Sequence, residues 1–274
     1  FDVFLVEEPT GQQRDYAGLH YLIKDHTVQV VPMLRPWLKA TRGRSDARSA
    51  YLGMAPTYDG TDLAPLRSNA REVQRAEAAI GGIVLEGDVA SETAFKRNAG
   101  AATVLHLAMH TKMDMIDPMQ LALAFGRADT SNDGLLNMYE LYGMDLHASL
   151  ALLSACNTGT GPLLGGEGIM SMARAFQYAG CPSVMMNLWA CDDETSGAIV
   201  AAFFDHLREG EELDDALRSV KLAHLQGSDP QKAHPYYWAT LVLLGDERPI
   251  DLSQPWYFSP WIWASLAALL VLVG

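Results

Sequence analysis

Cysteine is scarce in this chain, and none of its cysteines forms a CxxC pair. Cys156, Cys181 and Cys191 make an odd number at irregular spacing. Such a set indicates neither a disulfide framework nor a zinc knuckle. A reducing compartment is therefore the simpler expectation.

Basic residues are also few. The chain has 20 Lys and Arg against 33 Asp and Glu, which gives a net charge of −13. This balance disfavours nucleic-acid binding, which depends on counterion release, and attraction to an anionic membrane surface. A partner attracted by charge would be a basic peptide or protein. No cationic segment leads into an apolar one, so no signal peptide is visible.

The 274-residue chain has the composition of a globular protein, with 49% hydrophobic and 19% charged residues. Short, nearly continuous apolar runs alternate with amphipathic stretches, a pattern that predicts an α/β fold with a mostly parallel sheet and helices on both faces. We expect one domain over residues 1–250 and a separate tail over 251–274. The predicted strands cover residues 2–9, 28–32, 50–56, 83–87, 103–109, 150–156, 182–189 and 239–246, and the predicted helices cover 66–80, 169–180, 194–210 and 213–225.

Two histidines occur in the run "TVLHLAMH", which reads as a strand. Strand alternation places His106 and His110 on the same side, and His110 comes last, at the carboxyl end, where working residues collect in such sheets. Four residues of strand span roughly 13 Å, too far for two ligands of one zinc ion, and the glutamate of an HExxH motif is absent. We therefore expect no metal here, and we interpret His106 as a core histidine.

Cys156 ends another apolar run, "LALLSAC", and opens the glycine-rich stretch "NTGTGPLLGGEG". A cysteine at a strand exit is partly exposed beside backbone N–H groups, and a nearby histidine could take its proton. Cys156 follows His110 by 46 residues, close to the roughly 50-residue interval between histidine and cysteine in caspases. These features favour a nucleophile over a small buried hydrophobe, the usual role of a lone cysteine.

Four motifs in this order resemble the CHAT domain, a caspase-like and separase-like cysteine peptidase domain found in bacteria. They are "VLHLAMH", "DGLLNMYELYGMDLHASLALLSACNTG", "GGEGIMSMARAFQYAGCPSVMMNLWACDDET" and "HPYYWATLVLLGD". The resemblance runs from about residue 20 to 246. It implies a caspase-haemoglobinase fold without a cofactor, His110 as general base and Cys156 as nucleophile. It also implies an upstream region of tetratricopeptide or other sensing repeats.

Residue 111 departs from the family pattern, because Thr111 stands where glycine usually follows the histidine. In the family, the N–H at this position and that of the nucleophile, here Cys156, form the oxyanion hole, where one donor contributes roughly 3 to 4 kcal/mol in other enzymes. Threonine keeps the N–H, but its branched side chain restricts the backbone. The leading expectation is a cysteine endopeptidase, and the alternative is a catalytically silent CHAT domain that serves as an interaction scaffold.

The stretch "DTSNDGLLNMYE" has the residue pattern of a calcium-binding EF-hand loop. The alternative interpretation is a turn at "NDG" followed by a capping box, in which Asn137 and Glu140 begin a helix. Gly143 interrupts the long exiting helix that an EF-hand needs, so the capping box is favoured. The residues at ligand or turn positions are Asp129, Ser131, Asp133, Gly134, Asn137 and Glu140.

The stretch "LWACDDETSG" is acidic, as the first turn of a helix often is. It also resembles the separase segment whose acidic residue lines the S1 pocket, and Asp193 aligns with that residue. A carboxylate at the base of a pocket would select a basic P1 side chain. The sequence leaves both interpretations of Asp193 open.

Residues 256–274, "WYFSPWIWASLAALLVLVG", contain no charge and approach the roughly 20 residues that span a bilayer core. Aromatic residues cluster at the start of this run, as in an interfacial belt. We expect a truncated C-terminal transmembrane helix that anchors a cytoplasmic domain to the inner membrane. The alternative is a buried helix, but the run has no polar stripe.

Overall fold

A computed structural model describes most of the chain. Cys156 and the apolar run over residues 256–274 lie outside the part that it describes, and so does the calcium-loop candidate Asp129. The described residues are 2–6, 16–30, 49–113, 121–127, 131–154, 167–189, 192–227 and 229–252.

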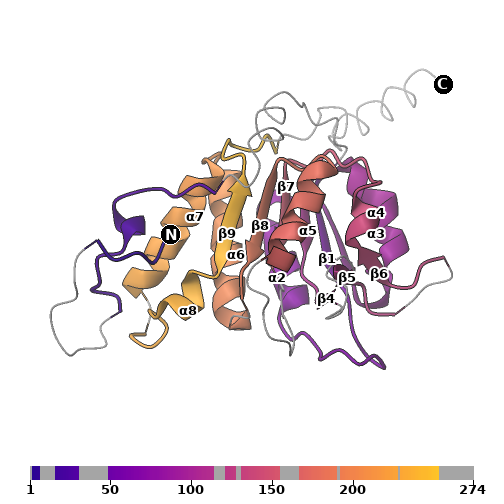
Figure 1. The fold of residues 1–274 in the computed structure, drawn as a ribbon, viewed down its shortest axis with the longest axis horizontal. Helices are drawn as coiled ribbons and strands as arrows, with labels where there is room; N and C mark the ends of the chain where they lie inside the picture. Colours follow the sequence, from indigo (N-terminus) through magenta and orange to yellow (C-terminus); the bar gives the residue numbers. More distant parts are fainter. Residues whose placement is uncertain are drawn as a thin grey trace, which may run out of the picture.

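A six-stranded sheet in the order β2-β1-β3-β7-β8-β9 forms the centre of the domain (Figure 1). Neighbouring strands are parallel except for β9, which runs antiparallel to β8. The predicted mostly parallel sheet is therefore confirmed. Its strands are β1 (Ser49–Ala55), β2 (Ile83–Glu86), β3 (Ala102–Leu107), β7 (Leu150–Leu153), β8 (Ser183–Asn187) and β9 (Leu241–Gly245).

Helices cover both faces of this sheet, as predicted (Figure 1). Alternate strand residues enter two separate cores: Leu105 and Met186 pack with α3, α4 and α5, whereas Val104 and Met185 pack with α2, α6 and α7. Burial on both faces explains why the strands are continuous apolar runs. The helices are α2 (Asn69–Ile80), α3 (Glu92–Asn98), α4 (Met138–Leu141), α5 (Glu167–Tyr178), α6 (Asp193–Arg208), α7 (Leu213–Gly227) and α8 (Pro235–Trp238), with 3₁₀ turns η1 (Leu22–Lys24), η2 (Gly87–Val89) and η3 (Ala99–Ala101).

A second, three-stranded antiparallel sheet follows His110 directly and was not predicted. Its order is β4-β5-β6, with β4 (Thr111–Met113), β5 (Leu121–Ala124) and β6 (Leu135–Asn137). Strands of three or four residues are too short to show a period. The chain therefore passes from the parallel sheet into this small sheet at His110.

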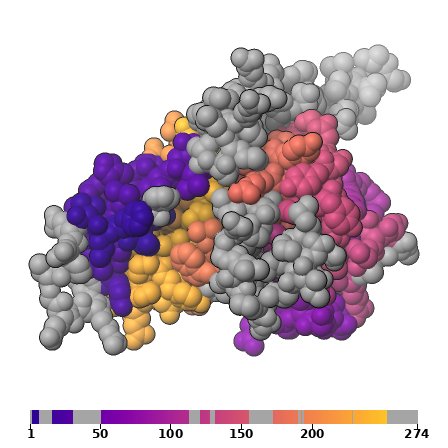
Figure 2. Space-filling model, in the orientation of Figure 1, coloured from indigo at the N-terminus to yellow at the C-terminus, as the bar shows by residue number. Residues whose placement is uncertain are grey.

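The two strands predicted nearest the N-terminus are wrong where the structure describes them. In the first predicted strand, the described residues 2–6 make only an isolated bridge, from Leu5 to Tyr21. In the second, the described residues 28–30 also make only an isolated bridge, from Val30 to Leu244. The side chains of residues 3–6 are exposed, so no core selects one face of an extended strand there. This N-terminal segment lies against the C-terminal residues of the domain, indigo beside yellow in Figure 2.

No helix within the described residues is long and apolar enough to cross a membrane. The predicted transmembrane run over residues 256–274 lies outside them.

Candidate active site

His110 lies just beyond the carboxyl end of β3, where the sequence predicted a working residue. Its side chain is 3% exposed, and Nε2 lies 2.7 Å from the carbonyl oxygen of Ala64. A carbonyl can only accept, so Nε2 carries a hydrogen. In the neutral imidazole the lone pair is then on Nδ1. This contact fixes both the tautomer and the ring orientation, as a hydrogen-bonded partner does for many functional histidines.

Tyr58 contacts His110 in two ways. The N–H of His110 donates to the Tyr58 hydroxyl over 2.8 Å, and that hydroxyl donates to the carbonyl of Ala124 over 2.8 Å. The two rings pack with their centroids 4.7 Å apart. Tyr58 is 2% exposed, and burial raises the pKa of its hydroxyl well above the usual range. The hydroxyl therefore stays protonated and keeps its role as a donor. No local motif indicates this contact, because Tyr58 lies far from His110 along the chain.

Thr111 is the first residue of β4, and it pairs with Leu123 of β5. The preceding carbonyl, that of His110, accepts from the N–H of Ala124 over 2.9 Å. Hydrogen-bonded and non-hydrogen-bonded positions alternate along an antiparallel pair. The N–H of Thr111 therefore points away from β5.

His106 is a fully buried core histidine, as predicted, with 0% exposure. Its Nε2 lies 2.8 Å from a carboxylate oxygen of Glu72 and 3.2 Å from the hydroxyl of Ser154. Its Nδ1 lies 2.8 Å from the hydroxyl of Tyr51. These contacts join α2, β1, β3 and the end of β7. The sequence indicated the burial but not the partners.

Ser154 is held from the other side by Asn187, the last residue of β8. The side-chain N–H of Asn187 donates to the Ser154 carbonyl, and both residues are buried. His106, Ser154 and Asn187 thus form a polar rung across three adjacent strands. Because Leu107 of β3 pairs with Leu153 of β7, the two strands that lead to His110 and Cys156 leave the sheet at the same level. Cys156 itself lies outside the described residues.

The acidic segment after β8 begins α6. The carboxylate of Asp192, the N-cap, accepts from the N–H and the hydroxyl of Thr195 over 3.0 and 2.7 Å. Glu194 pairs with Lys232. The capping role thus belongs to Asp192. Asp193 is the first residue of α6, and its side chain is not among those that the structure describes.

Cys181 is fully buried in the hydrophobic core, and burial raises the pKa of its thiol to about 12. It is consequently a poor nucleophile at neutral pH. Cys191 lies outside the described residues.

The capping box predicted in place of a calcium loop is confirmed. Asn137 and Glu140 make the reciprocal bonds at the start of α4, which has four residues. Lys96 lies 2.8 Å from Glu140 and 2.6 Å from Glu92. Because the N–H of Asn137 donates to the other oxygen of Glu140, both carboxylate oxygens at the last ligand position of the candidate loop have protein partners.

Two clusters of acidic and histidine side chains could hold a metal within the described part of the chain. They lie where α6 ends and α7 begins, and neither includes His106 or His110. The clusters are His206, Glu209 and Glu211, and Glu212, Asp214 and Asp215.

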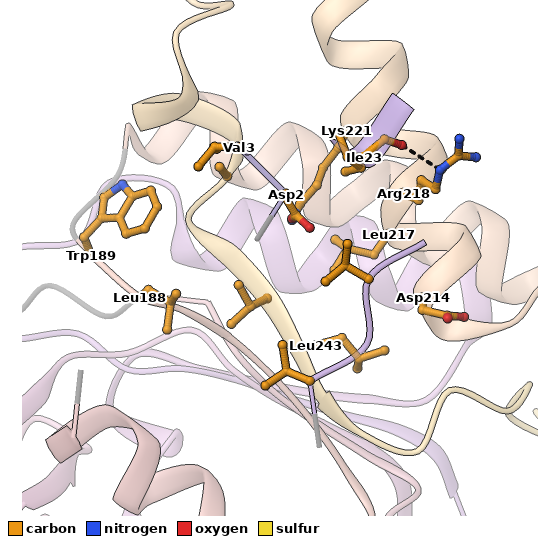
Figure 3. A pocket seen from close by; sticks show the side chains of 14 residues that line it. Asp2, Val3, Ile23, Leu188, Trp189, Asp214, Leu217, Arg218, Lys221 and Leu243 are labelled. Atoms are coloured by element: carbon orange, nitrogen blue, oxygen red, sulfur yellow. Dashed lines mark hydrogen bonds and ion pairs between the residues drawn. The ribbon is translucent and has the colours of Figure 1, made fainter. Parts of the chain in front are cut away.

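A cavity of about 130 Å³ lies apart from His110, between the N-terminal segment, α7 and the edge strand β9 (Figure 3). Its walls are mostly apolar. The buried ammonium of Lys221 pairs there with Asp2, and Arg218 donates to the carbonyl of Ile23. Burial lowers the pKa of Lys221, against the opposing effect of Asp2. Trp189, which follows β8, also lines this cavity.

The parallel sheet with helices on both faces is similar to the fold of caspase-like cysteine proteinases. The crystal structure of the Arg-specific cysteine proteinase gingipain R matches with a TM-score of 0.53 at 11% identity, over 79% of this chain and 52% of that one. The Drosophila initiator caspase Dronc matches with a TM-score of 0.39 at 8% identity, over 68% of this chain and 76% of that one.

The family model of the CHAT domain matches residues 6–246, so the chain belongs to the CHAT domain family. Among curated proteins, tetratricopeptide repeat protein 28 of Mus musculus is 28% identical over 125 residues, and that of Homo sapiens is 25% identical over 122. Each match covers 44% of this chain and 5% of the relative. The chain thus spans a small part of the curated relatives that it matches.

Proposed function

We propose that this chain is a cysteine endopeptidase that acts through His110 and Cys156 without a cofactor. Membership in the CHAT family and the caspase-like fold support the proposal. The observation that carries it is the contact between His110 Nε2 and the Ala64 carbonyl. It holds a buried imidazole at the carboxyl end of β3, with the lone pair on the other nitrogen, next to the strand that leads to Cys156.

The proposed reaction has two halves. Nδ1 of His110 takes the thiol proton of Cys156, and the thiolate attacks the scissile carbonyl carbon. The N–H groups of Thr111 and Cys156 bind the resulting oxyanion. Collapse breaks the C–N bond, and His110 gives its proton to the leaving amine. Water, deprotonated by the same imidazole, then hydrolyses the thioester and regenerates the thiol.

The orientation of Thr111 supports its part in this scheme. The carbonyl of the preceding peptide is bound by Ala124, which turns the N–H of Thr111 away from β5. A donor that is fixed before substrate binds stabilises developing charge without reorganising. The β-branch of Thr111 does not remove this donor.

For the substrate, we propose a protein segment with arginine or lysine at P1, bound by Asp193. The neighbouring acidic residues have other partners, since Asp192 caps α6 and Glu194 pairs with Lys232. The net charge of −13 would also attract basic segments.

Two further proposals concern the longer protein. The curated relatives are named as tetratricopeptide repeat proteins, and we propose that an upstream repeat region regulates the peptidase. Residues 256–274 would anchor it, with the domain on the cytoplasmic side, because this run is uncharged and nearly long enough to span a bilayer.

Alkylation of the three cysteines tests the proposal. Iodoacetamide should modify Cys156 faster than Cys181 at neutral pH, and His110→Ala should slow the modification of Cys156. A peptide library should then show cleavage by the wild type and none by Cys156→Ala. Equal cleavage by Cys156→Ala would refute the assignment. An unreactive Cys156, with no cleavage by a folded wild type, would favour the interaction scaffold.

A further inference from the structure

We propose that Tyr58 is a positioning residue whose single hydroxyl sets the place of both His110 and the Thr111 N–H. The inference rests on the proposed function. Its basis is the path of the chain at residue 110, where the parallel sheet ends and the small antiparallel sheet begins.

The β4-β5 register shows what the hydroxyl replaces. Thr111 pairs with Leu123, so His110 stands opposite Ala124 one step earlier. In a hydrogen-bonded pair of antiparallel strands, the two opposite residues exchange two direct N–H···O hydrogen bonds. Here one is direct, from the N–H of Ala124 to the carbonyl of His110 over 2.9 Å. The other runs through Tyr58, which accepts from His110 and donates to Ala124.

The inserted hydroxyl therefore acts as a spacer between His110 and Ala124. The hydroxyl is the hydrogen-bond partner of both the His110 N–H and the Ala124 carbonyl. Without it, these two buried groups would lack a partner or would have to approach each other. If they approached, the backbone of His110 would move toward β5 and carry the imidazole with it. The peptide that bears the Thr111 N–H would move as well, because its carbonyl belongs to His110.

The ring of Tyr58 adds a second restraint. It lies 4.7 Å from the imidazole, measured between centroids, while the carbonyl of Ala64 holds Nε2. The backbone, the ring and one nitrogen of His110 are thus each restrained by a different contact. A misplacement of about 1 Å in such a group can lower a rate by about a hundredfold.

A purely structural tyrosine is the rival interpretation, since Tyr58 also belongs to the hydrophobic core. Tyr51 offers a matched control. It too is buried, and its hydroxyl contacts a histidine, but that histidine is His106. Replacing either tyrosine with phenylalanine removes one buried hydroxyl and keeps the ring. A structural role predicts similar effects from both changes, whereas positioning predicts different ones.

The experiment compares Tyr58→Phe, Tyr51→Phe and His110→Ala in the same chain, well below their unfolding temperatures. The measurements are kcat and KM on the best library peptide and the alkylation rate of Cys156. We expect Tyr58→Phe to lower kcat by about 10- to 100-fold with KM changed by less than about threefold. Tyr51→Phe should keep kcat within about threefold while losing stability.

Wild-type kcat in Tyr58→Phe, with His110→Ala inactive, would overturn the inference and leave the proposed function standing. Full activity in His110→Ala would instead refute the proposed function. If Tyr58→Phe does not fold, amide hydrogen exchange of the wild type decides. Protection at the His110 N–H is expected, and exchange at the rate of an unstructured peptide would show that the hydroxyl bridge is absent.

Discussion

His106→Ala and His110→Ala form a matched pair of substitutions with opposite expected effects. The two residues lie four apart on one segment, and both are buried. We expect His106→Ala to lower stability and to leave Cys156 reactive. His110→Ala should lower stability less and should slow the alkylation of Cys156.

The magnitude follows from the partners of each imidazole. His106 contacts Glu72, Tyr51 and Ser154, and its removal leaves the Glu72 carboxylate buried without its partner. A buried polar group left without its hydrogen-bond partner costs about 1 to 3 kcal/mol, so the loss of these three contacts lowers the free energy of unfolding by about 3 to 5 kcal/mol. His110 loses one hydrogen bond, to Ala64, worth about 1 kcal/mol. Both changes delete the same side chain, so the difference of about 3 kcal/mol reports on the additional contacts of His106.

Urea unfolding of the two variants measures this difference, provided that the slopes agree. The midpoint temperature should fall by roughly 6 to 20 °C for His106→Ala. Adding Glu72→Gln to His106→Ala should recover part of the loss, because it removes the unpaired charge. Equal stability of the two histidine variants would refute the argument from the three contacts of His106. Loss of Cys156 reactivity in a folded His106→Ala protein would refute the assignment of His106 to the core alone.

Three further predictions concern Thr111, Asp193 and the C-terminal apolar run. Thr111→Gly should keep or raise kcat, because the N–H remains and the β-branch is lost; a fall of about a hundredfold or more in steady-state assays would reveal a role for the side chain. Asp193→Ala should lose a preference for arginine or lysine at P1 with the fold intact, as a peptide library would show; lost stability with unchanged specificity would indicate a helix-start role instead. Deletion of residues 255–274 should release the protein from the membrane fraction on cell fractionation, and the anchor is wrong if both forms stay soluble.

The parallel sheet was predictable because its central strands β3, β7 and β8 are buried on both faces. Residues such as Leu105 and Val104 enter different cores, so neither face required polar residues, and the apolar runs stand out from the helices between them. The position of His110 at the end of such a run followed from the same pattern. The capping box of Asn137 and Glu140 was also predictable, since its residues are neighbours along the chain.

The rest of the site depends on contacts between residues that are distant in the sequence. Tyr58 meets His110, and Glu72 meets His106, only because β1, β3 and α2 pack together. Neither partner lies in a motif that local spacing could reveal. The strands of the small sheet are too short to show a period of apolar residues in the sequence. The orientation of the Thr111 N–H, which depends on the pairing of β4 with β5, could therefore not be predicted.

The polar rung adds a reason why the ends of β3 and β7 stay in register. His106 binds the hydroxyl of Ser154, and Asn187 binds its carbonyl, so the last residue before the exit of β7 is held by both neighbouring strands. An apolar rung would pack about as well, because a buried hydrogen bond adds only about 1 kcal/mol of net stability. Apolar contacts are non-directional, however, and would leave the rotation of the Ser154 peptide unspecified. A hydrogen bond fixes that direction. The bond from Asn187, which His106→Ala leaves in place, therefore constrains the chain as it leaves the sheet beside the end of β3. A reaction between groups on two different strands needs such a constraint.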